Sequence, residues 1–199
     1  MKLHASISSP FVRKVRMVMA LRGLDREIAL LPTDTNDPDG RLQGVNPLGK
    51  IPVLELDDGT TLFDSRVIAE YVDSIGTAGE PVFPVGADRW PALKLGALGD
   101  GICDAAVLCV YEGRYRPEEM QYAPWVDRQR QRITCALDTL ESAPPTGDPL
   151  TIGDIAVATA LGYLDFRLEG AWRADHPKMV TWLDRFAVAV PAFAATAPD

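Results

Sequence analysis

A change in character at residues 74–87 limits the possible folds of this chain more than any other feature. This segment reads S-I-G-T-A-G-E-P-V-F-P-V-G-A, and its three glycines and two prolines are typical of a linker. Before it, short apolar runs alternate with helical patterns, whereas after Asp88 strand signals nearly vanish. The pattern predicts a small α/β domain over residues 1–77, a linker over 78–87 and an all-helical domain over 88–199.

The first part is expected to hold a small mixed sheet with helices beside it. Apolar runs predict strands, and apolar residues at helical spacing followed by Gly23 predict the first helix. An Asp-Asp-Gly turn between two β-prone runs predicts a hairpin, and a crossover helix would make the first two strands parallel. The expected strands cover 2–6, 27–31, 51–56 and 60–63, the expected helices 11–22 and 65–72, and the expected loop 33–40.

The second part is expected to be helical throughout. Thr151 and Asp154 stand three residues apart ahead of an apolar run, which predicts a capping box at a helix start. A purely structural role is expected for this pair. The expected helices cover 90–111, 123–140, 153–166 and 178–188.

Composition and charge narrow the classes of function. The 199 residues are 47% hydrophobic and 24% charged, as in an ordinary globular protein, and the formal net charge is −8. Proteins that coat nucleic acid usually carry a basic patch, so this balance argues against that function but leaves room for a local basic pocket. The N-terminus lacks the pattern of a secretory signal, and no stretch approaches the roughly 18 apolar residues that span a bilayer. A cytoplasmic protein without nucleic-acid or membrane partners is expected.

The three cysteines are Cys103, Cys109 and Cys135, and they show no C-x-x-C spacing. Their odd number and spacing argue against a disulfide framework or a zinc site, so no metal is expected. We expect these cysteines to be small buried apolar residues in a reducing compartment.

The segment Ser8-Ser9-Pro10-Phe11 lies between the first expected strand and helix. Proline suits the first helical position, so Ser9 is predicted to be the N-cap. In one interpretation Ser9 only caps the helix. In a second, its hydroxyl and the nearby backbone amides also face a ligand, because a helix N-terminus stabilises negative charge such as a thiolate. The spacing leaves both open. The basic residues that follow, Arg13, Lys14 and Arg16, are interpreted as a solvated helix face.

Two later segments carry similar signals. In the run Asn46-Pro47-Leu48-Gly49-Lys50-Ile51-Pro52-Val53-Leu54, a proline at a strand entry indicates an edge or turn, and a cis Ile51–Pro52 bond would expose the Ile51 backbone to a partner. In Phe63-Asp64-Ser65-Arg66, an acidic residue and a hydroxyl begin another helix, whose amide-rich end would suit a carboxylate. A simple entry from a loop into a strand explains the first of these segments as well, and simple helix capping explains the second.

Taken together, the three segments resemble the soluble glutathione transferase family. Ser-Pro-Phe before an Arg-containing helix, the Asn-Pro-Leu-Gly-Lys-Ile-Pro-Val-Leu run, and Phe-Asp-Ser before Ile-Ala-Glu-Tyr-Val stand in the family's order and spacing. The resemblance extends over the whole chain, and Thr151-Ile152-Gly153-Asp154 matches the family's capping motif. Each piece alone is weak, whereas the ordered set is highly specific.

The resemblance implies a thioredoxin-like N-terminal domain and an all-α C-terminal domain, usually in a homodimer. Pro52 would be the family's cis proline, and the Ile51 backbone would pair with the cysteinyl part of glutathione. Asp64 and Ser65 would hold the γ-glutamyl end, and Lys50 would lie near the glycyl carboxylate. The implied glutathione-binding residues are Ser9, Phe11, Lys50, Ile51, Pro52, Asp64 and Ser65.

By the same resemblance, Ser9 aligns with the catalytic serine of the theta and zeta classes and with the cysteine of the omega class. Ser8 is the alternative, one residue away. Thioredoxin-like redox enzymes place two cysteines where this chain has Ser9-Pro10-Phe11-Val12, so disulfide exchange by the protein itself is not expected. The Ser9 hydroxyl would instead donate a hydrogen bond to the glutathione sulfur and favour the thiolate, which is the species that attacks.

The implied function is transfer of glutathione to a small hydrophobic electrophile, as in detoxification. The second substrate would lie in a cleft between the domains, with Tyr111, Arg114 and Tyr115 as candidate residues of its pocket. A glutathione-dependent isomerase or peroxidase and a non-catalytic binding or assembly protein remain alternatives.

Overall fold

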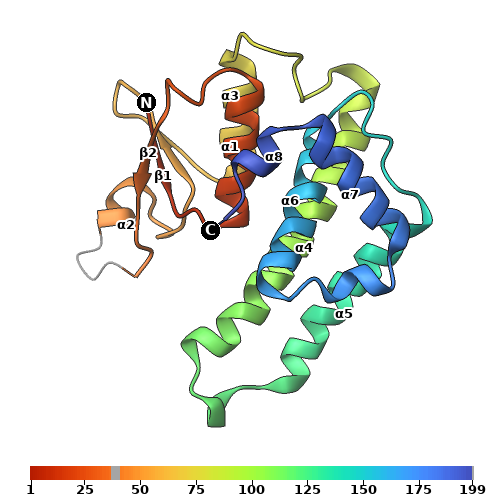
Figure 1. Ribbon diagram of the computed structural model, residues 1–199. Coiled ribbons are helices and arrows are strands. Elements are labelled where there is room, and N and C mark those ends of the chain that lie inside the picture. Colours follow the sequence, from red (N-terminus) through yellow and green to blue (C-terminus); the bar gives the residue numbers. More distant parts are fainter. Residues whose placement is uncertain (37–40, 199) are drawn as a thin grey trace. The chain divides into compact units, whose positions relative to one another are not determined.

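The computed structural model describes residues 1–36 and 41–198, so the expected loop over 33–40 lies partly outside the described residues. The chain divides into two compact units (Figure 1). The first comprises Met1–Pro84 and the described residues from Ala192 onward, and the second comprises Val85–Pro191. No helix in the described ranges has the length and apolar character needed to cross a membrane.

A four-stranded mixed sheet in the order β2-β1-β3-β4 forms the base of the first unit. β1 pairs in parallel with β2, and the β1–β3 and β3–β4 pairs are antiparallel. The parallel pair confirms the prediction made from the crossover helix. The strands are β1 (Lys2–Ala5), β2 (Ala29–Pro32), β3 (Val53–Glu55) and β4 (Thr61–Leu62), and the helices are α1 (Pro10–Leu21), α2 (Arg41–Val45), α3 (Ser65–Ile75) and α8 (Ala192–Ala195).

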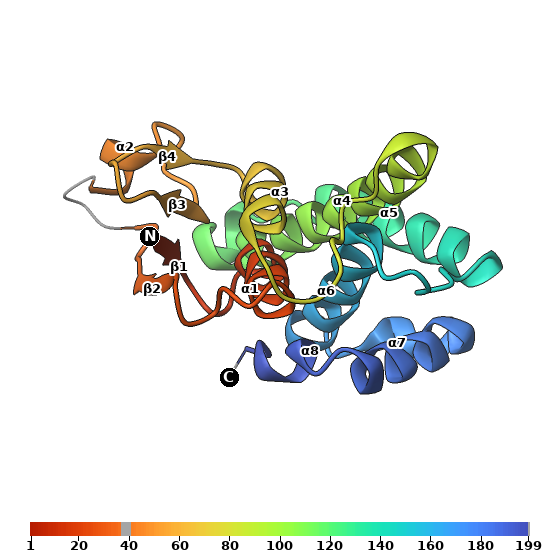
Figure 2. The ribbon, with the colours of Figure 1, turned by 90° about the horizontal axis from the view of Figure 1, so that it is seen from above.

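The core of the first unit lies where α1 and α3 pack together beside the sheet (Figure 2). Leu3 and Val53 from the sheet, Val15 from α1 and Ile68 from α3 are all fully buried. Burying a side chain of this kind contributes about 1.5–3 kcal/mol each. This packing fixes the positions at which α1 and α3 begin, and those positions matter for the site.

A buried ion pair holds the chain that follows α3. Arg22 Nε lies 3.1 Å from Asp73 Oδ1. The Asp73 carboxylate accepts hydrogen bonds from the N–H groups of Val82 and Phe83, both at 3.0 Å, and Arg22 Nη2 donates to the carbonyl of Gly76 at 2.6 Å. The glycine- and proline-rich segment is therefore fixed to the first unit. The domain limits expected from the sequence remain predictions.

The expectation of a solvated basic face on α1 is wrong for Arg13 and Lys14, which are buried. Arg13 Nη2 donates to the carbonyl oxygen of Phe193 at 2.7 Å, and its guanidinium carbon lies 4.2 Å from the Phe193 ring centroid. The C-terminal helix α8 thus covers a charged part of α1 and contacts the Arg13 guanidinium through a carbonyl oxygen and an aromatic face. Helix α8 is not among the helices that the sequence pattern predicts.

The second unit is helical, and its four long helices confirm the four that were expected. Its described residues contain no strand. The long helices are α4 (Arg89–Tyr115), α5 (Ala123–Ser142), α6 (Ile152–Arg167) and α7 (Pro177–Ala189), and short 3-10 helices cover Gly86–Asp88, Glu118–Met120 and Ala171–Ala174.

Helices α4 and α6 lie side by side in the second unit (Figure 1). Their backbones approach so closely that a Cβ atom on Gly99 would lie 2.6 Å from the carbonyl carbon of Ala156. A Cβ atom on Gly153 would likewise lie 2.8 Å from the carbonyl oxygen of Ala92. These contacts advance in the same direction along both helices, so α4 and α6 run in the same direction where they pack together.

The three cysteines differ in exposure, and all are free thiols. The expectation of burial is confirmed for Cys103 and wrong for Cys135, which lies exposed on α5. Cys109 is half-buried, and burial raises the pKa of its thiol while the nearby Arg130 opposes that shift. Small apolar character did not predict burial here because Cys135 lies at an open, solvent-exposed position of α5.

Candidate active site

Three connecting segments meet at one end of the strands of the four-stranded sheet, and we refer to this end as the sheet edge. β1 ends at this edge, and β3 begins there because Val53 stands opposite His4. β4 also ends there, because Leu62 stands opposite Leu54. When these registers are continued, the residues after β1, before β3 and after β4 become neighbours. The sheet therefore gathers the three segments that the sequence analysis singled out.

Ser9 begins α1 as its N-cap, as predicted. Its backbone is extended, with φ −81° and ψ 125°, and its Oγ accepts a hydrogen bond from the Val12 N–H at 3.4 Å. This distance is long compared with the usual 2.9–3.0 Å or so, so the cap is weak. Within the described residues the Ser9 hydroxyl donates to no acceptor. The hydroxyl therefore keeps its proton available for another partner.

Ser8, the alternative, is engaged by a neighbour. Its Oγ lies 3.1 Å from Ser6 Oγ, and one of the two hydroxyls donates to the other. Phe11, the second residue of α1, is half-buried. Of the two serines, Ser9 is the one whose hydroxyl stands at the helix N-terminus with an unused donor.

The segment before β3 is shaped by a residue whose role the sequence analysis missed. Asn46 is buried; its Nδ2 donates to the carbonyl oxygen of Lys50 at 2.8 Å, and its Oδ1 accepts from the Leu48 N–H at 3.0 Å. Asparagine before proline at a loop start was the available signal, because such side chains form turns with their own backbone. Asn46 thereby holds the loop that presents Lys50 and Ile51.

The Ile51–Pro52 peptide bond is cis, which confirms the geometry expected for Pro52. Pro52 is buried and Ile51 is half-buried. Neither the N–H nor the C=O of Ile51 makes a backbone hydrogen bond within the described residues. The exposed side chain of Lys50 has no ion-pair partner in the same part of the chain. This segment thus offers a backbone donor, a backbone acceptor and a cation.

Asp64 and Ser65 begin α3. Asp64 is the N-cap and accepts a hydrogen bond at Oδ1 from the Arg66 N–H at 2.9 Å. Ser65, the first residue of the helix, is 3% exposed. The Phe63–Asp64 peptide is also cis, which the sequence analysis did not foresee. Asp64 itself is exposed, so its carboxylate keeps acceptor capacity for a ligand.

The edge therefore combines two helix N-termini, an unpaired backbone segment and one lysine. The first N–H groups of a helix have no partner within it, and together with the helix dipole they favour negative charge. α1 would favour an anion near Ser9, and α3 would favour a carboxylate near Ser65. Asp64 adds an acceptor for a cation. These features suit an extended molecule with charged groups at both ends and an ionisable group between them.

In the second unit, the last turn of α4 brings together the three residues expected for a second pocket. The rings of Tyr111 and Tyr115 meet edge to face, with centroids 5.0 Å apart. The guanidinium carbon of Arg114 lies 5.8 Å from the Tyr111 ring centroid. Burial raises the pKa of the Tyr111 hydroxyl, with Tyr115 adding to the shift and Arg114 opposing it. At neutral pH this tyrosine is therefore a neutral hydrogen-bond donor.

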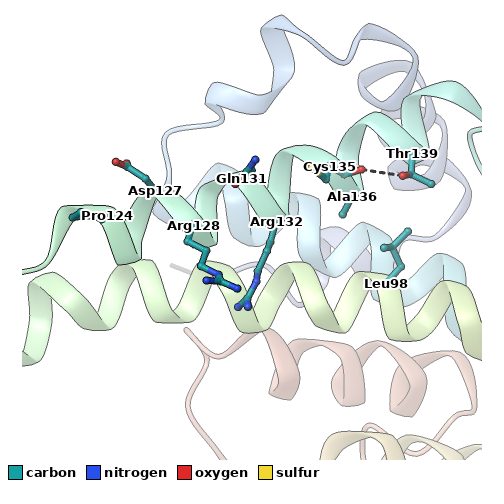
Figure 3. Close-up of a pocket in the computed structure, with 9 residues that line it drawn as sticks. All are labelled: Leu98, Pro124, Asp127, Arg128, Gln131, Arg132, Cys135, Ala136 and Thr139. Carbon is teal, nitrogen blue, oxygen red and sulfur yellow. Dashed lines mark hydrogen bonds between the residues drawn. The ribbon is translucent and has the colours of Figure 1, made fainter.

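The second unit also carries an open groove along α5, beside α4, of about 1060 Å³ (Figure 3). In Figure 3 the side chains of Arg128 and Arg132 extend toward α4. None of the expected site residues lines this groove. Its lining residues are Leu98, Pro124, Asp127, Arg128, Gln131, Arg132, Cys135, Ala136 and Thr139. In the described ranges, no group of three or more His, Cys, Asp or Glu side chains has the arrangement of a metal site.

Comparison with known proteins identifies relatives over the full length. Residues 8–75 match the family described as glutathione S-transferase, N-terminal domain, and residues 123–185 match glutathione S-transferase, C-terminal domain. The uncharacterized GST-like protein YibF of Escherichia coli (strain K12) is 37% identical over 206 residues, which is 100% of this chain and 98% of the relative.

Solved structures also resemble this chain over its full length. A crystal structure of a glutathione transferase family member from Pseudomonas fluorescens Pf-5, with bound glutathione, is 41% identical with a TM-score of 0.93 and covers 100% of this chain and 98% of that one. A second crystal structure of a family member from that organism holds S-(propanoic acid)-glutathione, with 41% identity, a TM-score of 0.90 and 100% of both chains covered.

Proposed function

The chain belongs to the glutathione S-transferase family, and from that membership we propose that it binds glutathione and activates its thiol for attack on an electrophile. The observation that carries this proposal is the start of α1. There the Ser9 hydroxyl accepts one long hydrogen bond and donates none within the described residues. A hydroxyl in that state at a helix N-terminus is suited to stabilise a thiolate.

We propose that the three segments at the sheet edge each bind one part of the tripeptide. The free N–H and C=O of Ile51 suit the cysteinyl backbone, as an added strand would. The N-terminus of α3 at Ser65 suits the γ-glutamyl carboxylate, and the Asp64 carboxylate suits its amine. Lys50 suits the glycyl carboxylate. Phe11, which is half-buried, and Pro52, which lies buried beside Ile51, are proposed to border these segments.

In this mechanism the cysteinyl thiol loses its proton to water, and Ser9 donates a hydrogen bond to the resulting sulfur anion. The unpaired N–H groups of α1 add to that stabilisation, so the pKa of the bound thiol falls. The thiolate then forms a carbon–sulfur bond with the electrophile. Each unit of pKa lowering corresponds to about 1.4 kcal/mol in favour of the thiolate. The protein forms no covalent intermediate.

The relatives support both steps of the proposal. The Pseudomonas fluorescens family member holds glutathione in one crystal structure. In the other the bound molecule is S-(propanoic acid)-glutathione, in which the sulfur already carries an organic group. By analogy with the family we also propose a homodimer in the cytoplasm, which size-exclusion chromatography with light scattering and fractionation of the source cells would test.

The proposal is tested by calorimetric titration of glutathione, together with ultraviolet absorbance of the bound thiolate as a function of pH. Binding and a thiol pKa below that of free glutathione are expected for the unmodified protein. The Ser9→Ala variant should still bind glutathione but should lose most of the pKa lowering. Absence of glutathione binding would instead favour a non-catalytic binding or assembly protein.

A further inference from the structure

The turn ahead of β3 is organised around one buried side chain, that of Asn46, which is 2% exposed. Its backbone N–H donates to the carbonyl oxygen of Leu42 in α2, and its C=O accepts from the Gly49 N–H, both at 2.8 Å. In the side chain, Oδ1 accepts from the Leu48 N–H at 3.0 Å, and Nδ2 donates to the carbonyl oxygen of Lys50 at 2.8 Å. Asn46 thus joins α2 to the turn and the turn to Lys50.

Most of these contacts belong to a turn that the local sequence favours. The run Asn46-Pro47-Leu48-Gly49 has asparagine at the first position of a β-turn, proline at the second and glycine at the fourth, as type I turns prefer. The Oδ1 contact is the one that asparagine and aspartate side chains make with their own backbone two residues on. The Nδ2 contact differs, because it extends beyond the turn to Lys50 and needs a donor that a carboxylate lacks.

The Nδ2 contact fixes the orientation of one peptide group. The C=O of Lys50 and the N–H of Ile51 belong to the same planar trans peptide, so they point in opposite directions. Because the carbonyl is held against the buried Asn46 amide, the Ile51 N–H is directed to the opposite side. Within the described residues this N–H donates to no backbone acceptor. The result is a donor with a fixed direction that is still available to a ligand.

We propose that Asn46 is a positioning residue for glutathione, which acts through the Lys50–Ile51 peptide to direct the Ile51 N–H at the cysteinyl carbonyl of the tripeptide. This inference rests on the proposed function, and all of its residues lie in the first unit. Asn46 contacts neither the tripeptide nor its sulfur in this arrangement. A donor that already has its binding orientation avoids the entropic cost of being ordered by the ligand. Asn46 therefore raises the affinity for glutathione and leaves thiol activation to Ser9.

A purely structural explanation competes with this proposal. In that explanation Asn46 stabilises the turn, and the affinity for glutathione does not depend on the Nδ2 donor. Aspartate serves the turn equally well, because its carboxylate accepts from the Leu48 N–H, but it cannot donate to the carbonyl of Lys50. Asn46→Asp therefore removes the Nδ2 contact and retains the turn. Serine makes the same kind of turn with a shorter, neutral side chain that does not extend to Lys50, so Asn46→Ser is a second variant.

The first measurement is hydrogen exchange at the Ile51 amide of the unmodified full chain, followed by nuclear magnetic resonance. Saturating glutathione should slow this exchange by about tenfold, because the cysteinyl carbonyl becomes the acceptor that the N–H lacks.

The second measurement is the dissociation constant for glutathione, determined by calorimetry. Asn46→Asp and Asn46→Ser should each raise it by about tenfold, the effect of losing one oriented hydrogen bond. At saturation the pKa of the bound thiol should stay within a few tenths of a unit of its original value. In steady-state kinetics KM should therefore rise while kcat is retained.

Gln43→Glu is the matched control, because it makes the same amide-to-acid change at an exposed position of α2. It should leave the dissociation constant for glutathione within about twofold of its original value. The effect of Asn46→Asp should persist at raised ionic strength, since salt screens repulsion between exposed charges but does not restore the orientation of a peptide. Thermal unfolding shows which variants are folded.

Binding of glutathione without slower exchange at the Ile51 amide overturns the inference. So does an unchanged dissociation constant in the folded Asn46 variants, an equal loss of affinity in Gln43→Glu, or a loss in Asn46→Asp that disappears at high salt. A rise in the pKa of the bound thiol in the Asn46 variants would indicate general damage to the site and overturns it too. If neither Asn46 variant folds, the structural explanation holds instead. Failure of the unmodified chain to bind glutathione contradicts the proposed function.

Discussion

Helices α1 and α6 both begin at a hydroxyl residue, yet the two hydroxyls are in opposite states. At α6, the N–H and the O–H of Thr151 both donate to Asp154 Oδ2, at 2.8 and 2.7 Å, and Asp154 is 3% exposed. At α1, Ser9 accepts one hydrogen bond at 3.4 Å and donates none within the described residues. At the start of α6 both donors of Thr151 are used within the helix start itself. At the start of α1 the O–H of Ser9 is not used.

This difference separates a purely structural cap from the cap that we propose also binds a ligand. The capping box at Thr151 was expected to be purely structural, and its geometry confirms a capping box with no donor left over. The start of α3 is intermediate, because Asp64 caps the helix at 2.9 Å while its carboxylate stays exposed. If the distinction holds, substitution at α6 should affect stability, and substitution at α1 should affect the chemistry of glutathione.

The largest effect is expected at Ser9. The Ser9→Ala variant loses the donor to the sulfur, so kcat/KM with glutathione and a model electrophile should fall about 100-fold. The pKa of the bound thiol should rise by roughly 1–2 units. Because the cap is weak, the free energy of unfolding should fall by only about 0.5 kcal/mol. Steady-state kinetics, thiolate absorbance and denaturant unfolding measure the three quantities.

Ser8→Ala is the matched control for that substitution, since it removes a hydroxyl one residue away that pairs with Ser6. It should leave the thiol pKa within a few tenths of a unit of its original value. A large rise in pKa for Ser8→Ala with little change for Ser9→Ala would mean that the sulfur faces Ser8 instead.

Asp154→Ala should give the opposite result to Ser9→Ala. Two hydrogen bonds at a buried helix start are lost, so the free energy of unfolding should fall by about 2 kcal/mol. For a chain of this size that corresponds to a Tm lower by roughly 5 °C. The pKa of the bound thiol should not change, because Asp154 belongs only to the start of α6. A shift in that pKa in the folded variant would contradict the separation between the two helix starts.

Asp64→Ala should change both properties by a smaller amount. Loss of the amine partner should raise the KM for glutathione about tenfold, and loss of the cap should lower the free energy of unfolding by about 1 kcal/mol. Asp64→Asn is the useful comparison, since asparagine caps nearly as well but lacks the charge. A KM that stays low in both variants would remove Asp64 from the site.

The smallest effect is expected at Lys50. Its exposed ammonium group should attract the glycyl carboxylate weakly, so Lys50→Gln should raise the KM for glutathione about threefold at low salt. The difference should shrink as ionic strength rises, because exposed charges are screened. Arg26→Gln, at an exposed position in the same unit, is the charge control. A salt-independent change in KM would point to a packing effect of the lysine stem.

Much of the fold and the outline of the site were readable from the chain. The cap at Ser9, the helix start at Asp64 and the capping box at Thr151 are local, because each joins residues two or three positions apart. The strands, the parallel pair and the four long helices follow from periodicity and short connections, which are local as well. The ordered motifs then identified the family.

Other features depend on residues that are distant in sequence. Arg13 is buried because Phe193, 180 positions away, covers it, and the charge pattern of α1 alone indicated a solvated face. The exposure of Cys135 and the unpaired Nε of Arg167 likewise depend on which helices pack against which faces.

Local geometry therefore specifies where each helix and strand begins, since the partners of a cap or a turn are encoded within a few residues. Burial and the availability of a donor are properties of the packed chain, since they depend on every segment that contacts the group. The sequence placed Ser9 at a helix start. The folded chain left its hydroxyl without an acceptor, and that is the property on which the proposed chemistry rests.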